Sequence, residues 1–299
     1  MEHNIRKPEI ICPVCGHNNY VSYLELRDYF LSEEEFSIIK CINCGLLITY
    51  PQPNPEELSR YYISNQYLSH ATQNKGLEYF VYNKIRNITL ANKLDLIRRF
   101  SSGNRIIDIG CATGVFLNYC QERNYKVQGI EPNTRARNYA IENFGLQVND
   151  IDYINEIPES SQDIVTMWHV LEHVPDISER MQAVLRMLKT DGTAFIALPN
   201  PNSYDARYYK EHWAAYDVPR HLYHFNRQSF DHLVKNVNFD IVDVIPMVFD
   251  SFYISLMSER YKKSTVPYLK AFYRGLRSNL YAKIHGNNYS SLIYILKKN

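Results

Sequence analysis

From residue 105 onward, short apolar runs alternate with amphipathic segments. The apolar runs predict β-strands at 105–109, 125–130, 146–148, 163–167 and 193–198. Apolar positions at helical spacing predict helices near 114–123, 133–143 and 176–189. This alternation is typical of an α/β fold whose parallel sheet is doubly wound, with helices on both faces. Such sheets bind ligands at the carboxyl ends of their strands.

The pattern changes toward the carboxyl terminus. Residues 239–249 and 289–297 both have strand character, with mostly helical sequence between them. We therefore expect the parallel sheet to be closed by an antiparallel pair of strands. In 266–285 the apolar side chains recur at helical spacing, and we expect them to pack on the sheet or to cover a substrate opening. They are Leu269, Phe272, Tyr273, Leu276, Leu280 and Ile284.

Two C-x-x-C pairs stand near the amino terminus. Cys12 and Cys15 lie in CPVCG, and Cys41 and Cys44 lie in CINCG. Two such turns, each followed by glycine, direct four thiolates at one point, which is the ligand set of a tetrahedral zinc ion. Four cysteines leave no open ligand position, so this zinc would be structural. Unligated thiols and two redox pairs are the alternatives.

These features divide the chain into three parts. We expect a zinc ribbon at 1–60, a linker and leading helix at 61–100, and the α/β domain at 101–299. The segments 212–226 and 251–288 are expected as insertions on the substrate side of that domain.

The distribution of charge along the chain indicates which kinds of binding partner are favoured. The formal net charge is +1, but residues 1–70 carry five basic and nine acidic side chains, whereas 250–299 carry nine basic and two acidic ones. An acidic ribbon makes nucleic acid an unlikely partner, because phosphate binding depends on Lys and Arg. The chain has no apolar run long enough for a transmembrane segment and no signal-peptide core, so we expect a cytoplasmic protein. Peripheral membrane contact through the basic tail stays open as an alternative.

The loop IIDIGCATGVF, 106–116, indicates a nucleotide-type ligand. It lacks the lysine of a Walker phosphate loop, and Ala112 and Val115 stand where a dinucleotide fingerprint has glycines. The pattern D-x-G-x-x-x-G fits instead, with Glu131 closing the next strand and placed to hydrogen-bond both hydroxyls of a ribose. A nucleoside site without a phosphate cradle suggests S-adenosylmethionine.

The segments RIIDIGCATG, GIEPN and WHVLEHVPD resemble, in order and spacing, the cofactor motifs of class I S-adenosylmethionine-dependent methyltransferases. The resemblance covers about 100–299 and is closest to the quinone-methylase-like small-molecule branch and to members with an amino-terminal zinc ribbon. It implies a Rossmann-like sheet of seven strands. It also implies cofactor contacts from Asp108, Gly110, Cys111, Ala112 and Gly114 at the methionine moiety, Glu131 at the ribose, Asp150 and Ile151 at the adenine, and Trp168 and His169 near the sulfonium. Ala112 replaces the commoner glycine, which is tolerable if its φ is negative.

Methyl transfer to a hydroxyl or an acidic carbon needs a base, and histidine is the usual one. Two segments are rich in histidine, 168–176 and 212–226. Our candidates for the base are His221, His173 and His224. The alternative for each is a hydrogen-bonded histidine that fixes a loop. For Arg220 the alternatives are an internal ion pair with Asp217 and a clamp for a substrate carboxylate or phosphate.

We therefore expect an S-adenosylmethionine-dependent methyltransferase that acts at oxygen or carbon of a small-molecule acceptor, such as a sugar or an envelope or secondary metabolite. An RNA methyltransferase that uses the ribbon as a reader is one alternative, and the acidic ribbon counts against it. A non-catalytic S-adenosylmethionine-binding protein is another, and the intact loop and Glu131 count against that. The acceptor, the methylated atom and the oligomeric state stay open.

Overall fold

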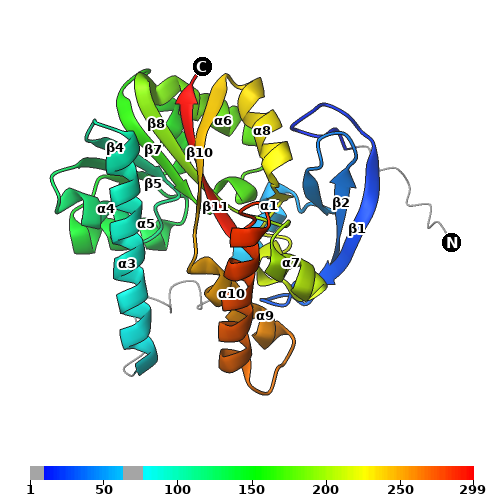
Figure 1. Cartoon of the computed structure of the whole chain (residues 1–299). Helices are drawn as coiled ribbons and strands as arrows, with labels where there is room; N and C mark the ends of the chain where they lie inside the picture. Colours follow the sequence, from blue (N-terminus) through cyan, green and yellow to red (C-terminus); the bar gives the residue numbers. More distant parts are fainter. Residues whose placement is uncertain (1–9, 63–76) are drawn as a thin grey trace.

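The computed structural model describes residues 10–62 and 77–299, which form two sheets. The larger sheet has seven strands in the order β10-β11-β8-β7-β4-β5-β6. Its middle strands run parallel, and β11 is antiparallel to both of its neighbours (Figure 1). The strands are β4 (Arg105–Ile109), β5 (Lys126–Ile130), β6 (Val148–Asn149), β7 (Gln162–Trp168), β8 (Leu188–Pro199), β10 (Phe239–Pro246) and β11 (Ser291–Lys298). The predicted seven-stranded α/β sheet with a closing antiparallel pair is confirmed.

Helices cover both faces of this sheet. The longer ones are α3 (Leu77–Phe100), α4 (Val115–Gln121), α5 (Thr134–Phe144), α6 (Ile177–Met187), α8 (Arg227–Asn236), α9 (Asp250–Tyr261) and α10 (Pro267–Ile284). The short ones are α1 (Pro55–Leu58), α7 (Tyr204–Tyr209) and the 3-10 turns η1 (Ser59–Tyr62), η2 (Ile151–Glu156), η3 (Leu171–His173), η4 (Lys210–His212) and η5 (Ala214–Tyr216).

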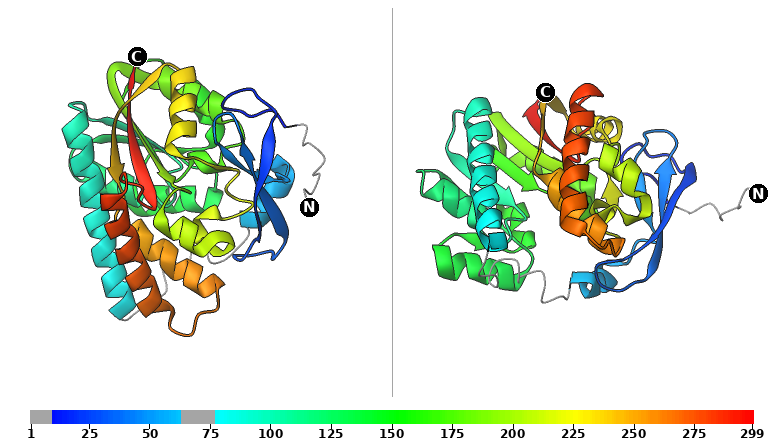
Figure 2. Two further views of the ribbon diagram at one scale, coloured as in Figure 1. Left: turned by 45° about the vertical axis from the view of Figure 1, so that its right-hand side comes forward. Right: turned by 60° about the horizontal axis from the view of Figure 1, so that its bottom comes forward.

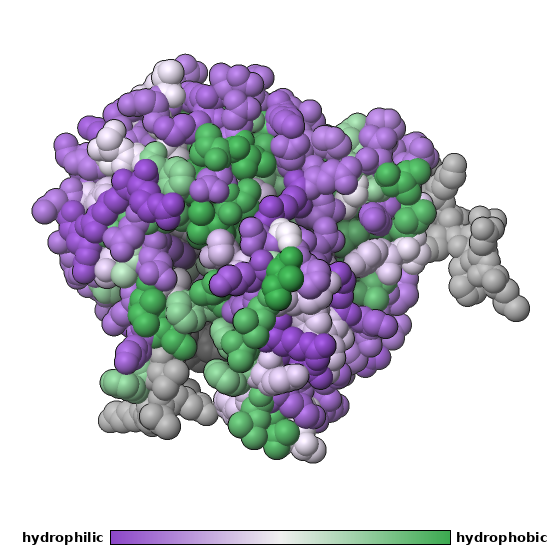
Figure 3. Space-filling model, viewed as in Figure 1, coloured by the Kyte–Doolittle hydropathy of each residue, from purple (hydrophilic) through white to green (hydrophobic). Residues whose placement is uncertain are grey.

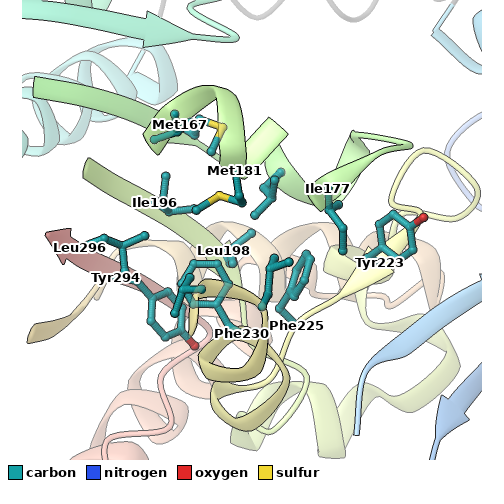
Figure 4. Packing of buried hydrophobic residues seen from close by; sticks show 14 of the residues in the cluster. Met167, Ile177, Met181, Ile196, Leu198, Tyr223, Phe225, Phe230, Tyr294 and Leu296 are labelled. Carbon is teal, nitrogen blue, oxygen red and sulfur yellow. The ribbon is translucent and has the colours of Figure 1, made fainter. Parts of the chain in front are cut away.

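The two faces follow from the alternation of side chains along each strand. On β8, Ile196 and Leu198 join the cluster under α6 and α8, while Phe195 and Ala197 join the cluster under α3 and α4. Figure 4 shows the first cluster, in which Met181 of α6 and Phe230 of α8 meet the sheet. The loops that follow the parallel strands leave the sheet at their carboxyl ends, the edge at which α/β sheets bind ligands.

One predicted boundary is wrong in an instructive way. The helix expected at 176–189 ends at Met187, and the strand expected at 193–198 already begins at Leu188. Leu188 pairs with Gln162 of β7, and Lys189 makes an ion pair with Asp163 at 2.5 Å. The first residues of β8 are largely polar and solvent-facing, so they lack the apolar alternation that identifies a strand. Such a segment looks the same in sequence as the last turn of an amphipathic helix.

The smaller sheet joins the amino-terminal region to the α/β part. It consists of β1 (Tyr20–Arg27), β2 (Glu35–Cys41), β3 (Leu47–Tyr50) and β9 (Tyr223–His224), all antiparallel. β9 belongs to the segment 212–226, so a strand from the α/β part completes the sheet of the ribbon. Both views of Figure 2 show the ribbon strands, in blue, lying directly against that part.

Helix α10 packs differently from our expectation. Its large apolar side chains are exposed rather than buried: Leu269, Phe272, Tyr273, Leu276, Leu280 and Ile284. They contribute to the green surface along this helix in Figure 3. The buried stripe consists instead of small residues, including Ala271, Gly275 and Ser278. A Cβ on Gly275 would lie 3.0 Å from the backbone of Phe252, so small residues are what lets α9 approach.

The exposed face is compatible with peripheral membrane contact, which stays a prediction. Among the described helices, none combines the length and the apolarity needed to cross a lipid bilayer.

Candidate active site

The buried acid of β4 lies at the centre of the candidate cofactor site. The Asp108 side chain is 2% exposed, and its Oδ1 accepts a hydrogen bond of 2.6 Å from Thr166 Oγ1 on the neighbouring strand β7. Burial raises the pKa of Asp108 to about 7, although Thr166 and the charge of Lys93 oppose the rise. A carboxyl held this way gains strongly from a cationic partner at the open end of the strand.

The loop after β4 needs a glycine at both Gly110 and Gly114. Gly110 and Gly114 both have positive φ, 72° and 75°. A Cβ on Gly110 would lie 2.5 Å from the Val170 side chain, and one on Gly114 would lie 2.6 Å from Leu146. The side chains of Val170 and Leu146 therefore pack directly against the loop backbone, and Gly114 is the N-cap of α4.

Ala112 departs from our expectation. Its φ is +49°, not negative, so an alanine occupies the left-handed region at a cost of about 1 kcal/mol. In this conformation Ala112 N–H donates to Glu131 Oε2 at 2.8 Å. The neighbouring Cys111 is buried, and burial raises the pKa of its thiol. This thiol is a packing group rather than a nucleophile.

Glu131 is fixed by the backbone on both sides. Besides the bond from Ala112, its Oε1 accepts from Asn133 N–H at 2.8 Å, and the residue is 8% exposed. Burial raises its pKa. Each carboxylate oxygen has a second lone pair that can accept from another donor, such as a ribose hydroxyl.

Asp150 and Ile151 follow β6. Asp150 Oδ1 accepts from Ile151 N–H at 2.6 Å and so caps η2, while Oδ2 forms an ion pair of 2.9 Å with Arg137. The adjacent Asn149 has a buried Nδ2 with no hydrogen-bond partner within 10–62 and 77–299. This donor lies at the carboxyl end of β6, next to the predicted adenine pair.

Trp168 and His169 end β7. The Trp168 ring meets Phe116 edge-on at 5.5 Å, and its buried Nε1 has no hydrogen-bond partner in the described part of the chain. His169 has a φ of +58° and contacts Asp250 Oδ2 through Nε2 at 3.0 Å. Burial alone would lower its pKa, but Asp250 and Glu172 raise the pKa to about 9.

These residues fit S-adenosylmethionine by the chemistry of their groups. The carboxyl ends of β4, β5, β6 and β7 lie next to one another in the sheet and offer two buried carboxylates and two unpartnered donors, Asn149 Nδ2 and Trp168 Nε1. A nucleoside with an amino-acid end carries an ammonium, a diol and an aromatic base, and each of these needs such a partner. Nothing in the arrangement resembles a phosphate cradle, in agreement with the loop pattern.

A cluster of acid and imidazole groups follows directly after Trp168. The rings of His173 and His221 are nearly perpendicular, 4.5 Å between centroids. Glu172 is 1% exposed, and its carboxylate oxygens accept no hydrogen bond from any described residue, although His169 Nδ1 lies 3.5 Å from Oε1. Ligand atoms of Glu172, His173 and His221 lie within 4.8 Å of one another, so this set could share protons or hold a divalent cation.

The hydrogen bonds of the two rings decide their tautomers. Nδ1 of His173 lies 3.0 Å from the Arg220 carbonyl and 3.0 Å from the Tyr62 hydroxyl, and Nδ1 of His221 lies 2.9 Å from the Ala215 carbonyl. A carbonyl oxygen only accepts, so each neutral ring carries its proton on Nδ1 and leaves Nε2 with a free lone pair. Burial and the neighbouring His221 lower the pKa of His173 to about 4.

His224 lies in a different environment. It belongs to β9, and its Nε2 lies 3.1 Å from Thr49 Oγ1, which itself donates to the His221 carbonyl at 2.6 Å. Burial holds the pKa of His224 well below its usual range. These contacts join β3 of the ribbon to the segment 212–226. They are the contacts expected of a histidine that fixes a loop.

Arg220 forms the internal ion pair that was one of its two alternatives. Its Nη2 lies 2.8 Å from Asp217 Oδ1 and 2.7 Å from Asp28 Oδ1, and the side chain is 2% exposed. Nε and both Nη atoms donate to Asp217, Asp28 and the Tyr61 carbonyl. All the donors of the guanidinium are thus engaged, which leaves none for a substrate anion.

Sequence reasoning missed the partners that come from distant segments. Tyr62 contacts His173 and Asp28 contacts Arg220 from the ribbon side, and Asp250 contacts His169 from α9. Lys93 of α3 places its ammonium 4.2 Å from the centre of the Trp168 ring. None of these residues stands in a motif, so no local signal could have found them.

The four cysteines of the ribbon converge as predicted. The Sγ atoms of Cys12 and Cys44 are 3.6 Å apart, and those of Cys15 and Cys41 are 3.5 Å apart. All four ligand atoms lie within 4.8 Å of one another. A tetrahedral zinc with Zn–S bonds of about 2.3 Å needs sulfurs roughly 3.8 Å apart, so the set fits zinc.

Comparison with known proteins connects this geometry to a family. The family described as "Methyltransferase domain" matches residues 82–244, which is more than half of the chain. The chain belongs to this methyltransferase family. The resemblance to class I S-adenosylmethionine-dependent methyltransferases is thereby confirmed.

The similar curated proteins include ubiquinone biosynthesis O-methyltransferases. The one from Yersinia enterocolitica is 31% identical over 125 residues, which cover 37% of this chain and 50% of the relative. The one from Nitrosomonas europaea is 28% identical over 160 residues, which cover 50% of this chain and 66% of the relative. The chain thus spans about half the length of the curated relatives it matches.

A solved structure shows the same fold. The geranyl diphosphate C-methyltransferase from Streptomyces coelicolor, determined with Mg²⁺, geranyl diphosphate and S-adenosyl-L-homocysteine, has a TM-score of 0.54 and 10% identity to this methyltransferase. The match covers 83% of this chain and all of that one.

Proposed function

We propose that this methyltransferase uses S-adenosylmethionine to methylate a hydroxyl oxygen of a small molecule, with the His173–His221 pair as base. The observation that carries the proposal is the Glu172–His173–His221 cluster, in which Glu172 and His173 follow β7 beside the candidate cofactor residues and His221 joins them from the segment 212–226. The names of the curated relatives support oxygen as the methylated atom.

The cofactor would be held by Asp108 at its methionine end and by Glu131 at its ribose, and when bound it supplies an electrophilic methyl group. The chain's own task is then to align the acceptor and to remove its proton. The lowered pKa of His173 keeps its imidazole neutral at pH 7 with Nε2 free, and it also makes the ring a weak base that needs a nearby anion to hold the proton.

Glu172 complements that role. Burial alone would raise its pKa, but His169, His221 and His173 hold its pKa below the usual range, so the carboxylate stays ionised. A buried carboxylate beside the base stabilises the imidazolium that forms when His173 or His221 accepts the proton. His173 is half-buried and His221 is buried, which favours His173 as the ring that meets the acceptor.

The ribbon is proposed to hold one structural zinc through Cys12, Cys15, Cys41 and Cys44. The convergence of four sulfurs and the lack of an open ligand position support this role. Its acidic composition gives no support to RNA binding.

The test separates binding from chemistry. Calorimetry with S-adenosylmethionine is expected to show binding that Glu131→Ala weakens strongly, because the ribose loses its acceptor. His173→Ala and His221→Ala should keep that binding and lose most of the methyl transfer to a panel of small hydroxylated compounds, measured with labelled cofactor.

His285→Ala is the matched control, since this histidine is exposed on the surface. Wild-type protein that fails to bind S-adenosylmethionine would refute the cofactor, and unchanged turnover in both active-site variants would refute the base.

A further inference from the structure

The helix pair α9–α10 carries a cavity whose lining residues do not belong to the candidate active site. Its volume is about 340 Å³, and three cationic side chains line it, those of Lys262, Lys270 and Arg274. One carboxylate, that of Glu259, also lines it. Glu259 is 3% exposed and accepts a hydrogen bond of 3.1 Å from the Tyr209 hydroxyl, so it takes part in the packing of α7 on α9. The cavity therefore carries an excess of positive charge.

The three cations of this cavity have only neutral partners. The Arg274 guanidinium lies 3.8 Å from the centre of the Tyr208 ring, and the Lys262 ammonium lies 5.4 Å from the same centre. Lys270 Nζ donates a hydrogen bond of 2.9 Å to Ser264 Oγ. Among the described residues, none forms an ion pair with any of the three cations. The ring and the hydroxyl position these groups and leave N–H donors for an anion that enters from solvent.

An exposed apolar stripe of α10 begins at this cavity. Leu269 and Tyr273 line the cavity and also belong to the stripe, which continues through Leu276 and Leu280 to Ile284. Leu269 is 74% exposed and Ile284 is 76% exposed. Figure 3 shows the resulting apolar surface along the helix. Because the small residues of α10 form its buried side, the apolar stripe faces away from the rest of the protein.

The charge of α10 indicates what covers this stripe. The helix has four basic residues and no acidic one; the basic residues are Lys270, Arg274, Arg277 and Lys283. A second copy of the chain on the same stripe would bring these like charges together, which disfavours it as the occupant. A helix with a wide apolar stripe flanked by Lys and Arg is typical of helices that lie in the interface of an anionic bilayer.

We propose that α10 binds an anionic lipid bilayer, with its apolar stripe in the interface and a lipid phosphate in the cavity of Lys262, Lys270 and Arg274. The apolar side chains supply burial in the interface, and the cations select an anionic surface. The inference goes beyond the proposed reaction and depends on neither its cofactor nor its base.

The experiment measures the partition of the full chain onto lipid vesicles by flotation. We expect binding to phosphatidylcholine vesicles that contain phosphatidylglycerol, and little binding to phosphatidylcholine alone or at high salt. Lys262→Gln with Lys270→Gln should weaken the binding roughly 10- to 30-fold, the effect of two cations at an anionic surface. The matched control is Lys40→Gln with Lys126→Gln, which removes the same charge at two exposed positions on other elements. The control should change binding by less than about twofold.

A second pair of variants tests the apolar stripe. Leu269→Ser with Leu280→Ser should weaken vesicle binding roughly tenfold or more, because two side chains no longer gain from burial in the interface. Ile42→Ser with Ile141→Ser is the matched control, since these side chains are exposed on other elements. All four variants exchange exposed side chains, and thermal unfolding checks that each one is folded.

Four results would overturn the proposal. The first is a wild type that does not bind the anionic vesicles, and the second is an equal loss of binding in the variants and their controls. The third is a dimer in solution that Leu269→Ser with Leu280→Ser dissociates, without vesicle binding, which would identify a second copy as the occupant. The fourth is calorimetric binding of inorganic phosphate that Lys262→Gln with Lys270→Gln removes, without vesicle binding, which would assign the cavity to a soluble anion.

Discussion

The two halves of the candidate site are held together over very different distances along the chain. In the cofactor half, Asp108, Gly110, Gly114 and Glu131 lie within one strand–loop–helix–strand unit, and Glu131 is fixed by backbone N–H groups of residues 112 and 133. In the acceptor half, His173 contacts Tyr62 across 111 positions of sequence. Arg220, whose carbonyl contacts the same ring, is paired with Asp28 across 192 positions.

This difference assigns the ribbon a role in the acceptor half. β9 pairs with β3, Thr49 bonds the carbonyl of His221, and Asp28 neutralises Arg220. Each contact joins the ribbon to 212–226, and none of them touches Glu131 or the loop after β4. A folded ribbon is therefore a condition for the histidine cluster but not for the cofactor residues.

Removal of the proposed zinc is expected to have the largest effect and to separate the two halves most clearly. Structural zinc contributes on the order of 10 kcal/mol to the folding of small zinc modules, so Cys12→Ser with Cys41→Ser should unfold the ribbon. We expect methyl transfer to be lost while the affinity for S-adenosylhomocysteine changes by less than about tenfold. Metal analysis, calorimetry and turnover on the same preparation measure this.

The control for that experiment is Cys120→Ser, a buried cysteine outside the ribbon, which should keep both the zinc and the turnover. Loss of cofactor affinity together with the zinc would show that the two halves are not independent.

The buried ion pairs allow a finer test. Asp28→Ala leaves Arg220 buried with one carboxylate fewer, and breaking a buried pair costs about 3–5 kcal/mol in the free energy of unfolding. Arg27→Ala, at the next position, breaks only an exposed pair with Glu35 and should cost less than about 1 kcal/mol. Denaturant unfolding measures both, and similar costs would contradict the buried triad.

The same difference explains what the sequence could predict. The cofactor half follows from local patterns: an apolar run, an acid, glycines at fixed spacing and a second acid at the end of the next strand. The acceptor half depends on contacts whose partners carry no mutual signal, and so His224 could not be distinguished from His221 by spacing. The apolar positions of α10 gave a wrong prediction of its buried face for a related reason. The face with Gly275 and Ser278 is buried because α9 packs closely against it, and the sequence of α10 alone does not show this contact.

Asp108→Asn tests the cofactor half through its pH dependence. The pKa of Asp108 is raised in the folded protein to about 7, so between about pH 4 and pH 7 only the unfolded chain releases this proton, and folding stability falls as pH rises. The amide removes this penalty. We expect the variant to gain on the order of 4 kcal/mol over the wild type at pH 8 and little at pH 4, and to bind S-adenosylmethionine more weakly.

Thermal unfolding at the two pH values and calorimetry measure this trade-off. Asp163→Asn is the matched control, because Lys189 and backbone N–H groups hold the pKa of Asp163 below its usual range despite partial burial. That variant should lose stability at pH 8. A gain in both would mean that charge at Asp108 is not the cause.

The smallest expected effect gives the most selective comparison, because it alters one hydroxyl in the acceptor half and one outside the candidate site. Thr49 Oγ1 donates to the His221 carbonyl at 2.6 Å, and Thr193 Oγ1 donates to the Phe100 carbonyl at 2.9 Å. Both residues are fully buried, so Thr49→Val and Thr193→Val should each cost about 1 kcal/mol in the free energy of unfolding. Only Thr49→Val should also lower turnover, because it frees the backbone that positions the His221 ring. Equal turnover in the two variants would show that the acceptor half tolerates small shifts of His221 and would favour His173 as the ring on which proton transfer depends.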